Sequence, residues 1–542
     1  MKLRRSSSFL SQPVNKIRDP RAEQRLFGLR ALLAIGVVLG ALLVLVARLY
    51  YLQVVHHSHF STLAEDNRVS IRPLTPTRGL IFDRNGVLLA DNLSSYRLEI
   101  TPERVDDLEA TLSVLGELIA LEAQDIERFK KLLRRNPRHR GTPLRFGLTE
   151  EEVAVLAINL HRLPGVEILA DLSRHYPQGA HGVHAIGYVG RINEQELQTL
   201  DPGQYTGSSH IGKVGVEKSY EALLRGRVGH EQVETNAAGR VLRVLGSTPP
   251  VPGQNLYLTL DFRLQQVAEA ALGEHNGAVV ALDPRNGQVL AMASQPVFDP
   301  NPFVNGIDAA SFRALNNSPD RPMFNRAIRG TYPPGSTIKP FIGLGGLVNG
   351  VITPHTSVYC PGFFRLPGSS HRFRDWKRGG HGRTALDKAI HQSCDVYYYE
   401  LASKLGIERL HDFLDRFNLG RPTGIDLVGE RSGLVPSVEW KRRTLGKPWY
   451  PGETVIAGIG QGYMLTTPLQ LAQATALLAM RGQGFKPHLL LESEDQATRE
   501  RTPRVPEPLP PIQVDNPRYW DEVINGMIHV VHGPRGTARR IG

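Results

Sequence analysis

The chain has 542 residues, a length that corresponds to about three or four domains. Its composition, 41% hydrophobic and 22% charged, is that of a globular protein and excludes a mostly disordered chain. Two cysteines and a mean hydropathy of −0.24 exclude a disulfide-built scaffold and a membrane protein with many spans. The net charge of +11 favours an anionic partner or surface, although the distribution of charge matters more than its sum.

Residues 31–47 carry no charged side chain, and apolar neighbours extend this run to the roughly 20 residues that cross a bilayer. Because the run has no polar face and no small-residue cleavage site follows it, the sequence predicts an uncleaved signal anchor over 31–50. Lysine and arginine far outnumber acidic residues before it, so residues 1–30 are expected to be a cytoplasmic tail. The rest of the chain would then lie outside the plasma membrane, where nucleic acid is not an expected partner.

A first domain is predicted over 51–248. Near its start, Asp83-Arg84-Asn85-Gly86 separates two apolar runs and predicts a tight hairpin, because Asn-Gly supplies the positive φ of such a turn. Residues 105–165 are charged and rich in leucine at helical spacing, which predicts a helical insertion. The proline-rich segment 249–254 is interpreted as a stiff linker and a domain boundary.

A second domain is predicted over 255–542. It opens with a strand-like stretch and a helix at 262–272. Apolar runs on either side of a Pro-Arg-Asn-Gly turn, at 277–283 and 287–292, predict a pair of strands. A later helix is predicted over 466–481, with a threonine as its N-cap and proline at its first position.

The strongest chemical signal is the tetrapeptide Ser336-Thr337-Ile338-Lys339. It follows a Pro-Pro-Gly sequence, so we expect a helix to start at Ser336 with Lys339 on the same face. A serine hydroxyl becomes nucleophilic when a base takes its proton, and a desolvated lysine can be that base. The alternative is a serine N-cap beside an exposed lysine, the usual meaning of an isolated Ser-x-x-Lys. This is, however, the only such pattern in the chain, and it follows a stretch built to start a helix.

A second triplet, Ser393-Cys394-Asp395, precedes an aromatic helical stretch. A second serine and an acid on a short turn can relay a proton between Lys339 and an amine. Taken alone this triplet is weak, because Ser-x-Asp sequences cap many helices. Its value comes from its position relative to Ser336.

Together these motifs resemble those of the penicillin-binding proteins, the Ser-x-x-Lys serine acyltransferases, and of their class B members in particular. Residues 78–86 and the Gly-Lys-Val-Gly-Val-Glu run at 212–217 resemble motifs of the class B pedestal domain. Residues 458–470 resemble the loop and helix behind the family's active site. Residues 375–382, and Asp395 where most relatives have asparagine, point to the members that act in cell elongation.

The resemblance implies a fold and a location. The fold is a single N-terminal transmembrane helix, an α+β pedestal or dimerisation-type domain over 51–248, and an α/β serine transpeptidase domain over 255–542. This last domain would be of the penicillin-binding, beta-lactamase-like kind. The location is the bacterial inner membrane, with the N-terminus in the cytoplasm and the catalytic domain in the periplasm.

It also implies a peptidoglycan D,D-transpeptidase that cross-links stem peptides during cell elongation and is inhibited by beta-lactams. Ser336 would attack the penultimate D-Ala carbonyl and Lys339 would accept its proton, while Ser393 passes that proton on and Asp395 orients Ser393. The implied partners are stem peptides, beta-lactams, the membrane, a SEDS-family glycosyltransferase such as RodA, and elongation-complex proteins such as MreC.

Two alternatives remain open at this point: a D,D-carboxypeptidase or beta-lactamase-like hydrolase, and a scaffold that activates a SEDS glycosyltransferase. One departure from the family is clear, because its third motif, Lys-[Ser/Thr]-Gly, occurs nowhere in the sequence. The last residues, 532–542, resemble the stretch just before that motif. We therefore expect the chain to be incomplete at its C-terminus.

A metal site is the last prediction, and its four candidate ligands lie between the nucleophile segment and the Ser393 turn. They are Cys360, Asp375, His381 and Cys394. Their side chains suit tetrahedral zinc, which would stabilise a glycine-rich segment that is poor in aliphatic residues and would hold the Ser393 turn. A disulfide and a pair of buried free thiols are the alternatives. His371 and His391 are weaker ligand candidates.

Overall fold

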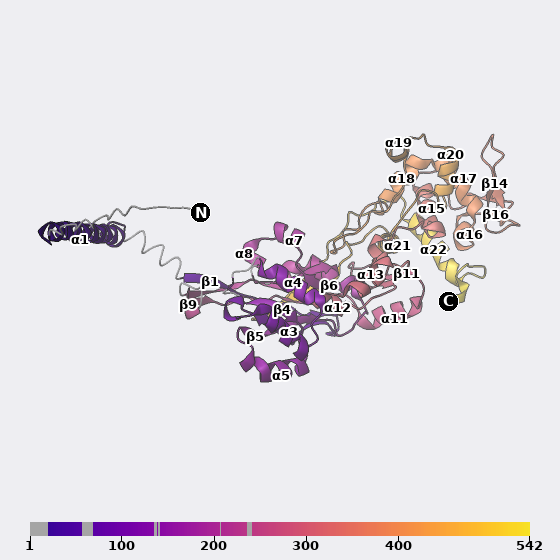
Figure 1. Cartoon of the computed structure of the whole chain (residues 1–542). Coiled ribbons are helices and arrows are strands. Elements are labelled where there is room, and N and C mark those ends of the chain that lie inside the picture. Colours follow the sequence, from indigo (N-terminus) through magenta and orange to yellow (C-terminus); the bar gives the residue numbers. More distant parts are fainter. Residues whose placement is uncertain are drawn as a thin grey trace, which may run out of the picture. The chain divides into compact units, whose positions relative to one another are not determined.

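The computed structural model describes residues 20–56, 69–134, 138, 141–205, 207–235 and 241–541. By internal contacts the chain divides into two compact units, Met1–Arg72 with Glu231–Gly246, and Pro73–His230 with Ser247–Gly542. Both units appear in Figure 1, coloured along the sequence. Residues 1–19 of the predicted cytoplasmic tail lie outside the described residues.

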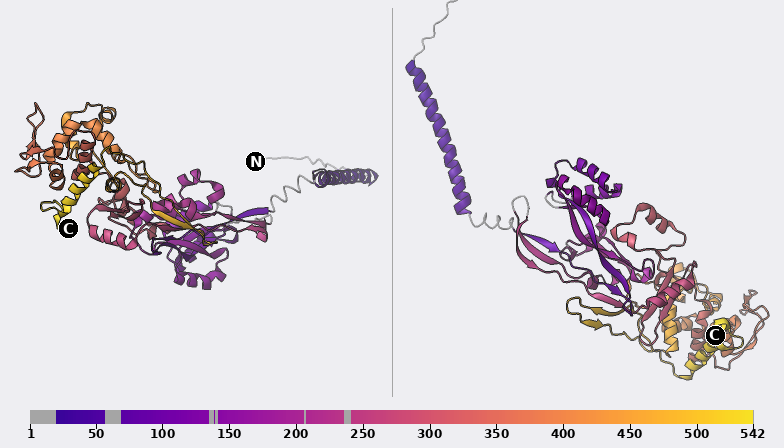
Figure 2. Two further views of the ribbon diagram at one scale, coloured as in Figure 1. Left: turned by 180° about the vertical axis from the view of Figure 1, so that it is seen from behind. Right: turned by 90° about the horizontal axis from the view of Figure 1, so that it is seen from below.

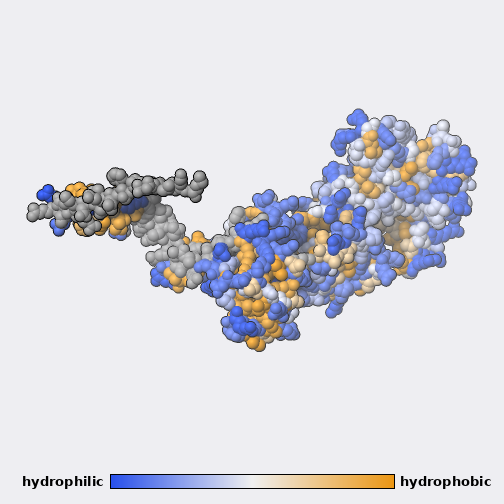
Figure 3. All heavy atoms as spheres, viewed as in Figure 1, coloured by the Kyte–Doolittle hydropathy of each residue, from blue (hydrophilic) through white to orange (hydrophobic). Residues whose placement is uncertain are grey.

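The first unit contains one long helix, α1 (Pro20–Tyr50), which continues into a π-helical turn at Tyr51–Val55. Residues Gln24–Val55 are long and apolar enough to cross a membrane, and their 18-residue apolar window has a mean hydropathy of 2.7. The apolar side chains of α1 are exposed, as its visible surface in Figure 3 shows. The helix begins well before residue 31, because the preceding Arg, Glu, Gln and Leu residues are good helix formers.

Three strands form a sheet whose larger part belongs to this unit, in the order β1-β8-β9. They are β1 (Val69–Leu74), β8 (Gly229–Thr235) and β9 (Val241–Thr248). Strand β9 lies at the edge of the sheet and leaves Val241, Leu242 and Val244 more than half exposed.

The second unit contains a seven-stranded sheet of order β18-β17-β10-β2-β3-β4, with β5 paired to β3. The strands are β2 (Ile81–Phe82), β3 (Leu88–Ile100), β4 (Thr142–Phe146), β5 (Val166–His175), β10 (Asn255–Leu258), β17 (Leu490–Glu494) and β18 (Arg501–Pro503). The predicted hairpin joins β2 to β3. Asp83 Oδ1 accepts from the backbone N–H groups of Asn85 and Val87, and Gly86 has the positive φ (84°) that the turn needs.

Among its described residues, the predicted helical insertion contains three α-helices and one strand. The helices are α3 (Leu108–Leu118), α4 (Ala123–Leu133) and α5 (Glu150–Asn159). They pack their apolar faces around Leu115, Phe129 and Leu156, which are fully buried. Strand β4 lies between α4 and α5 and pairs with β3, so the insertion is anchored to the large sheet.

The two pedestal-type motifs meet in a buried ionic cluster. Glu217 is fully buried and accepts from Arg78 Nε at 2.8 Å and from Arg174 Nε at 2.7 Å. Burial alone would raise the pKa of Glu217, but Arg174 and Arg78 hold it below the usual value. An unpaired charge would be costly at this depth. The pairing with two arginines therefore explains why these motifs, which are far apart in the sequence, lie close together in the fold.

Shorter elements complete this half of the second unit. They are the 3-10 turns at Pro102–Arg104 and Leu160–Arg162, α6 (Val183–Ile186), β6 (Tyr188–Arg191), α7 (Glu194–Thr199), α8 (Pro202–Tyr205), β7 (His210–Val214), α9 (Gly215–Ser219) and α10 (Glu221–Arg225). Strands β6 and β7 pair with each other, and α9 follows β7 directly.

The proline-rich segment 249–254 is held by hydrogen bonds rather than extending as a free linker. Gly253 N–H donates to Thr77 O, and Val251 and Arg227 exchange backbone hydrogen bonds. A Cβ on Gly253 would lie 1.8 Å from Leu224 O, so the close approach requires glycine. The next strand, β10, pairs with β2 on one side and β17 on the other, so the large sheet continues past this segment.

The remaining part is an antiparallel strand pair with helices. As predicted, α11 (Phe262–Leu272) precedes β11 (Gly277–Leu282), which pairs with β12 (Val289–Gln295). The further helices are α12 (Asn301–Asn305), α13 (Ala309–Asn317), α14 (Arg326–Arg329), α15 (Lys339–Val348), α16 (Leu386–His391), α17 (Asp395–Leu405), α18 (Ile407–Asp415), α19 (Val438–Leu445), α20 (Pro451–Ala457), α21 (Pro468–Ala479) and α22 (Arg518–His532). Two views of this arrangement are given in Figure 2.

The core of this part is built around α15 and α17. Phe341 on α15 and Tyr398 on α17 belong to one large cluster of buried side chains, together with Phe417. Short strands flank it as two pairs, β13 (Val358–Cys360) with β16 (Gly382–Thr384), and β14 (Phe363–Phe364) with β15 (Phe373–Arg374). A 3-10 turn at Arg539–Ile541 follows α22. The start of α15 and the start of α17 carry the candidate site.

Candidate active site

Ser336 lies on a 3-10 turn, Gly335–Ile338, and α15 begins only at Lys339. The predicted helix therefore starts three residues later than expected. Gly335 has a positive φ (58°) and its N–H donates to Gly460 O at 2.9 Å, which holds the chain in a tight turn. Pro340 lies in the first turn of α15, where its missing N–H costs little.

The loop after α20 supports this turn from behind. A Cβ on Gly460 would lie 2.3 Å from Gly335 O and 2.8 Å from Gly335 N, and Gly460 itself has φ +72°. Beside it, Tyr332 and Thr466 exchange backbone hydrogen bonds of 2.9 and 2.8 Å. Gly460 thus lets the loop approach the Ser336 turn closely.

Lys339 is buried, with 1% of its surface exposed, and its Nζ has three hydrogen-bond contacts. Nζ donates to Asp395 Oδ1 at 2.7 Å, to Ser393 Oγ at 2.9 Å and to Ser393 O at 3.0 Å. The ring of Tyr398 lies 5.5 Å from Nζ. The alternative of an exposed lysine beside a serine cap is therefore wrong.

A chain of hydrogen bonds joins the two serines to this lysine. Ser393 Oγ donates to Ser336 Oγ at 2.9 Å and accepts from Lys339 Nζ. Ser336 is exposed while Lys339 is buried, so the chain runs from the surface into the core. With a neutral lysine amine and both hydroxyl protons turned toward it, the same path can carry a proton from the Ser336 hydroxyl to Lys339.

Ser393 adopts an unusual backbone conformation, with φ +54°. For a residue with a side chain this region costs about 1–2 kcal/mol, so the surroundings must hold it. Ser393 N–H donates to Ile390 O, and the indole N–H of Trp376 donates to Ser393 O. The backbone N–H of Trp376 donates to Asp395 Oδ2 at 3.0 Å, which fixes the carboxylate at the first residue of α17.

Trp376 is the residue of this site to which the sequence assigned no role. It follows the zinc candidate Asp375 inside a motif that pointed only to the subfamily. Its backbone and indole N–H groups tie the Ser393 turn to the segment between β15 and β16. No spacing rule would have found it, because both bonds link residues from different loops.

The four residues predicted as zinc ligands lie together and are all buried. Their nearest donor atoms are within 4.8 Å of one another. Asp375 Oδ2 lies 3.5 Å from each of the two cysteine sulfurs, and Asp375 Oδ1 lies 3.3 Å from His381 Nδ1. Cys360 and Cys394 are free thiols in this structure, not a disulfide.

Burial shapes the chemistry of this cluster. It raises the pKa of the Cys394 thiol and lowers the pKa of the His381 imidazole, so neutral forms are favoured when no metal is bound. Among the described residues, His381 Nε2 has no hydrogen-bond partner. The weaker candidates lie elsewhere: His371 is exposed, and His391 contacts Asp387 and His529 instead.

Two family signatures match the chain. "Penicillin-binding Protein dimerisation domain" matches residues 73–258, and "Penicillin binding protein transpeptidase domain" matches residues 277–541. The second match contains the Ser336 turn, Lys339 and the Ser393 turn. Together with the apolar α1, these matches confirm the predicted fold class of an N-terminal apolar helix, a dimerisation-type domain and a transpeptidase domain.

Known proteins resemble nearly the whole chain. The Peptidoglycan D,D-transpeptidase MrdA of Escherichia coli (strain K12) is 42% identical over 530 residues, which cover 97% of this chain and 83% of that protein. The structure of Pseudomonas aeruginosa PBP2 in complex with WCK 5153 is 43% identical with a TM-score of 0.67, covering 87% of this chain and 83% of the other. Helicobacter pylori PBP2, in a complex with MreC, is 31% identical with a TM-score of 0.75, covering 87% and 86%. The chain therefore belongs to the PBP2/MrdA family of penicillin-binding transpeptidases.

Proposed function

We propose that this chain cross-links peptidoglycan stem peptides as a serine D,D-transpeptidase of cell elongation. The observation that carries the proposal is the hydrogen-bond chain from Ser336 through Ser393 to Lys339, with Asp395 paired to the lysine. Nothing in the described site favours a hydrolase or a purely structural role. A surface nucleophile joined to a buried base is what acyl transfer requires.

In the proposed acylation, Ser336 Oγ attacks the carbonyl carbon of the penultimate D-Ala and forms a new C–O bond. The hydroxyl proton passes through Ser393 Oγ to the neutral amine of Lys339, and Asp395 stabilises the resulting ammonium. The Ser336 N–H is one donor for the developing oxyanion. When the tetrahedral intermediate collapses, the C–N bond breaks and the terminal D-Ala leaves with a proton returned along the same path.

Deacylation reverses these roles. The amine of a second stem peptide attacks the acyl carbon, a C–N bond forms, and the ester bond to Ser336 breaks. The attacking amine loses its proton to Lys339 through Ser393, and Ser336 regains its own proton. A beta-lactam would enter the first half of this cycle and remain as an acyl-enzyme on Ser336.

The test is labelling of the full chain with a fluorescent penicillin. Ser336→Ala should abolish the label, and Ser393→Ala should slow labelling by about a hundredfold, the scale of a lost proton relay. Ser403→Ala, an exposed serine on α17, is the matched control and should label as the wild type does. Full labelling of a folded Ser336→Ala variant would place the nucleophile elsewhere.

We also propose that residues 31–50 anchor the chain in the inner membrane, with 1–30 cytoplasmic and the 51–248 and 255–542 domains periplasmic. The positive charges before the apolar run and the length of α1 support this topology. A cysteine placed before residue 20 should be protected from an impermeant thiol reagent in intact cells, whereas one placed at the exposed Ser403 should react. The reverse pattern would refute the orientation.

Two partners are proposed on different grounds. The complex of Helicobacter pylori PBP2 with MreC supports an MreC-type partner, for which the exposed apolar residues of β9 offer a surface. A SEDS glycosyltransferase such as RodA would contact α1, where Gly36 and Gly40 permit close helix packing. Replacing α1 with an unrelated span should disrupt the RodA complex and leave MreC binding unchanged. If both complexes still form after α1 is replaced, α1 does not make the contact proposed for it.

The buried Cys360, Asp375, His381 and Cys394 cluster is proposed to hold a structural zinc ion. The donor set suits zinc, and Asp375 Oδ2 also accepts from Val396 N–H, so the cluster braces the start of α17. Zinc bound there would contribute folding free energy; the chain's own residues carry out the chemistry.

Elemental analysis after purification without chelator tests this assignment. We expect close to one equivalent of zinc in the wild type and in the His371→Ala control, and a loss of zinc with a lower unfolding temperature in His381→Ala. Zinc well below one equivalent in the wild type, together with no titratable thiols after denaturation, would establish a disulfide instead.

A further inference from the structure

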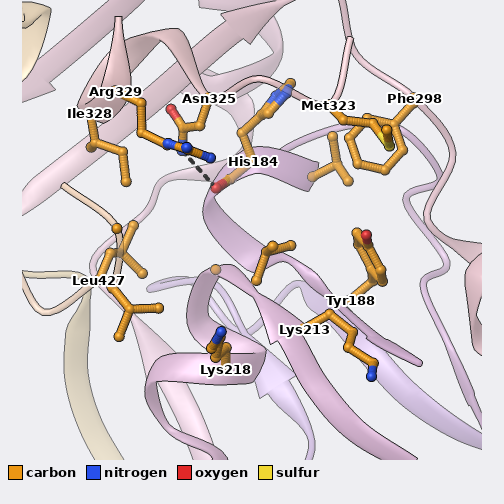
Figure 4. Close-up of a pocket in the computed structure, with 15 residues that line it drawn as sticks. His184, Tyr188, Lys213, Lys218, Phe298, Met323, Asn325, Ile328, Arg329 and Leu427 are labelled. Atoms are coloured by element: carbon orange, nitrogen blue, oxygen red, sulfur yellow. Dashed lines mark hydrogen bonds between the residues drawn. The ribbon is translucent and has the colours of Figure 1, made fainter. Parts of the chain in front are cut away.

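A cavity lies away from the Ser336 turn, where two segments of the second unit face each other. Its volume is about 310 Å³, at the lower end of the range of small-molecule sites. One side comes from α6, β6, β7 and α9, and the other from the segment after β12, α14 and residues 427–429. Figure 4 shows the labelled side chains around the hollow.

Much of the wall is apolar or aromatic. Tyr188 and Phe298 meet edge to face, with ring centroids 6.0 Å apart. Met323 and Leu427 line the same cavity, and Figure 4 shows them on opposite sides. The polar part of Asn325 is already engaged, because its side-chain amide donates to His184 O (the dashed line in Figure 4). The cavity therefore offers a ligand a largely apolar contact surface, on which the Asn325 side-chain amide is already hydrogen-bonded within the protein.

The cavity is also cationic. Lys213, Lys218 and Arg329 line it, and none of the 15 lining residues is acidic. Lys213 Nζ is neutralised by Glu196 Oε2 at 2.6 Å. The side chains of Lys218 and Arg329 have no ion-pair or hydrogen-bond partner within the described part of the chain, although the Arg329 guanidinium lies 5.6 Å from the Phe324 ring centroid. Two exposed cations thus lie beside an apolar hollow, and the Glu196 carboxylate that pairs with Lys213 also interacts electrostatically with Lys218.

The nearest histidine does not supply a further charge. His184 is buried, and this burial lowers its pKa to about 4, so the ring is neutral near pH 7. Its Nε2 lies 2.7 Å from Pro322 O and donates to it. The charge of the site therefore comes from the lysine and the arginine alone.

We propose that this cavity binds a peptide carboxylate of about dipeptide size, with its anionic end between Lys218 and Arg329 and its apolar body against Tyr188 and Phe298. A phosphate shares the anionic chemistry but needs more donors than this mostly apolar wall provides. A guanidinium pairs well with a carboxylate, and the Lys218 ammonium adds positive charge from the other side of the cavity. The site is separate from the acyl-transfer site and does not depend on its assignment.

The position of Arg329 connects the proposed ligand site to the active site through the protein chain. Arg329 ends α14, and the chain continues through Tyr332, which pairs with Thr466, to the Ser336 turn. Lys218 lies on α9 in the segment that the dimerisation-domain signature matches. A bound carboxylate would therefore tie this segment to the chain that leads into the nucleophile.

Calorimetric titration of the full chain in detergent tests the proposal. The protein is first treated with excess benzylpenicillin to block the acyl-transfer site. The probes are N-acetyl-D-alanyl-D-alanine, the same dipeptide as its C-terminal carboxamide, and inorganic phosphate. We expect the free carboxylate to bind at least about tenfold more tightly than the carboxamide, and more tightly than phosphate.

Variants locate the binding. Lys218→Ala and Arg329→Ala should each weaken binding at least about tenfold, and Val428→Trp, at an exposed residue that lines the cavity, should obstruct it without removing a charge. The matched controls, Lys131→Ala and Arg443→Ala, remove exposed cations elsewhere and should bind as the wild type does. Equal affinity for carboxylate and carboxamide, tighter binding of phosphate, or unchanged binding in both charge variants would each overturn the proposal.

Discussion

Gly460→Ala offers a sharp test of how the nucleophile is positioned. The added Cβ would lie 2.3 Å from Gly335 O, in a backbone that itself has φ +72°. An alanine at this φ costs about 1–2 kcal/mol in stability. Relief of the clash by movement of the neighbouring turn adds about 1–3 kcal/mol, the usual cost of overpacking. The turn that must move is the one carrying Ser336.

Gly462→Ala is the matched control within the same loop. Gly462 has nearly the same φ (75°), but its added Cβ would meet only the side chain of Ile456, at 3.3 Å. Both variants therefore bear the same backbone strain, and only Gly460→Ala displaces the Ser336 turn. Their free energies of unfolding should differ by about 1–3 kcal/mol.

Urea unfolding and the acylation rate with a fluorescent penicillin measure the two effects. A displacement of about 1 Å at a reacting group costs about a hundredfold in rate, so Gly460→Ala should acylate about a hundredfold more slowly than Gly462→Ala. Equal acylation rates in the two variants would refute the reasoning, because the support from Gly460 would then not position Ser336.

Three further predictions concern charge. Lys339→Arg should acylate at least about a hundredfold more slowly than the wild type, because a guanidinium cannot be deprotonated; an active arginine variant would mean that Lys339 acts only as a charge. Asp395→Ala should lower the free energy of unfolding in urea by about 3–5 kcal/mol by removing the ion-pair partner of the buried Lys339, and Asp395→Asn, which keeps a hydrogen-bond acceptor there, should cost less. Burial lowers the pKa of both His184 and His210 to about 4. On acidification the unfolded chain therefore binds protons at these histidines before the folded chain does, so their contribution to the free energy of unfolding is complete above pH 6.5 and is lost as the pH falls toward 4. Urea unfolding at pH 5 should show a loss of about 2 kcal/mol for each histidine relative to pH 7, and His210→Gln should reduce that loss; an unchanged pH dependence would contradict it.

Local chemistry in the sequence predicted much of the candidate site. Ser336 and Lys339 were found because three residues of spacing and a Pro-Pro-Gly start limit where their side chains can go. The two cysteines, with Asp375 and His381, were grouped by ligand type rather than by spacing, and they do lie together. These signals are short-range or depend on residue type, which is why they can be read from one sequence.

Long-range pairing explains what was missed. Strand β10 pairs with β2 across more than 170 positions of the chain, so residues expected to follow a linker continue the large sheet instead. The position of Ser336 on a 3-10 turn depends on a hydrogen bond from Gly335 to Gly460, which no local pattern reveals. The role of Trp376 likewise depends on contacts between separate loops.

The most direct test of the central claim is to locate the acyl group by mass spectrometry. The full chain is incubated with benzylpenicillin, digested, and its peptides are sequenced for the added mass. A single adduct on the Ser336 hydroxyl is the predicted result, and it should be absent from Ser336→Ala. An adduct on Ser393 or on another residue would contradict the assignment of Ser336 as the nucleophile.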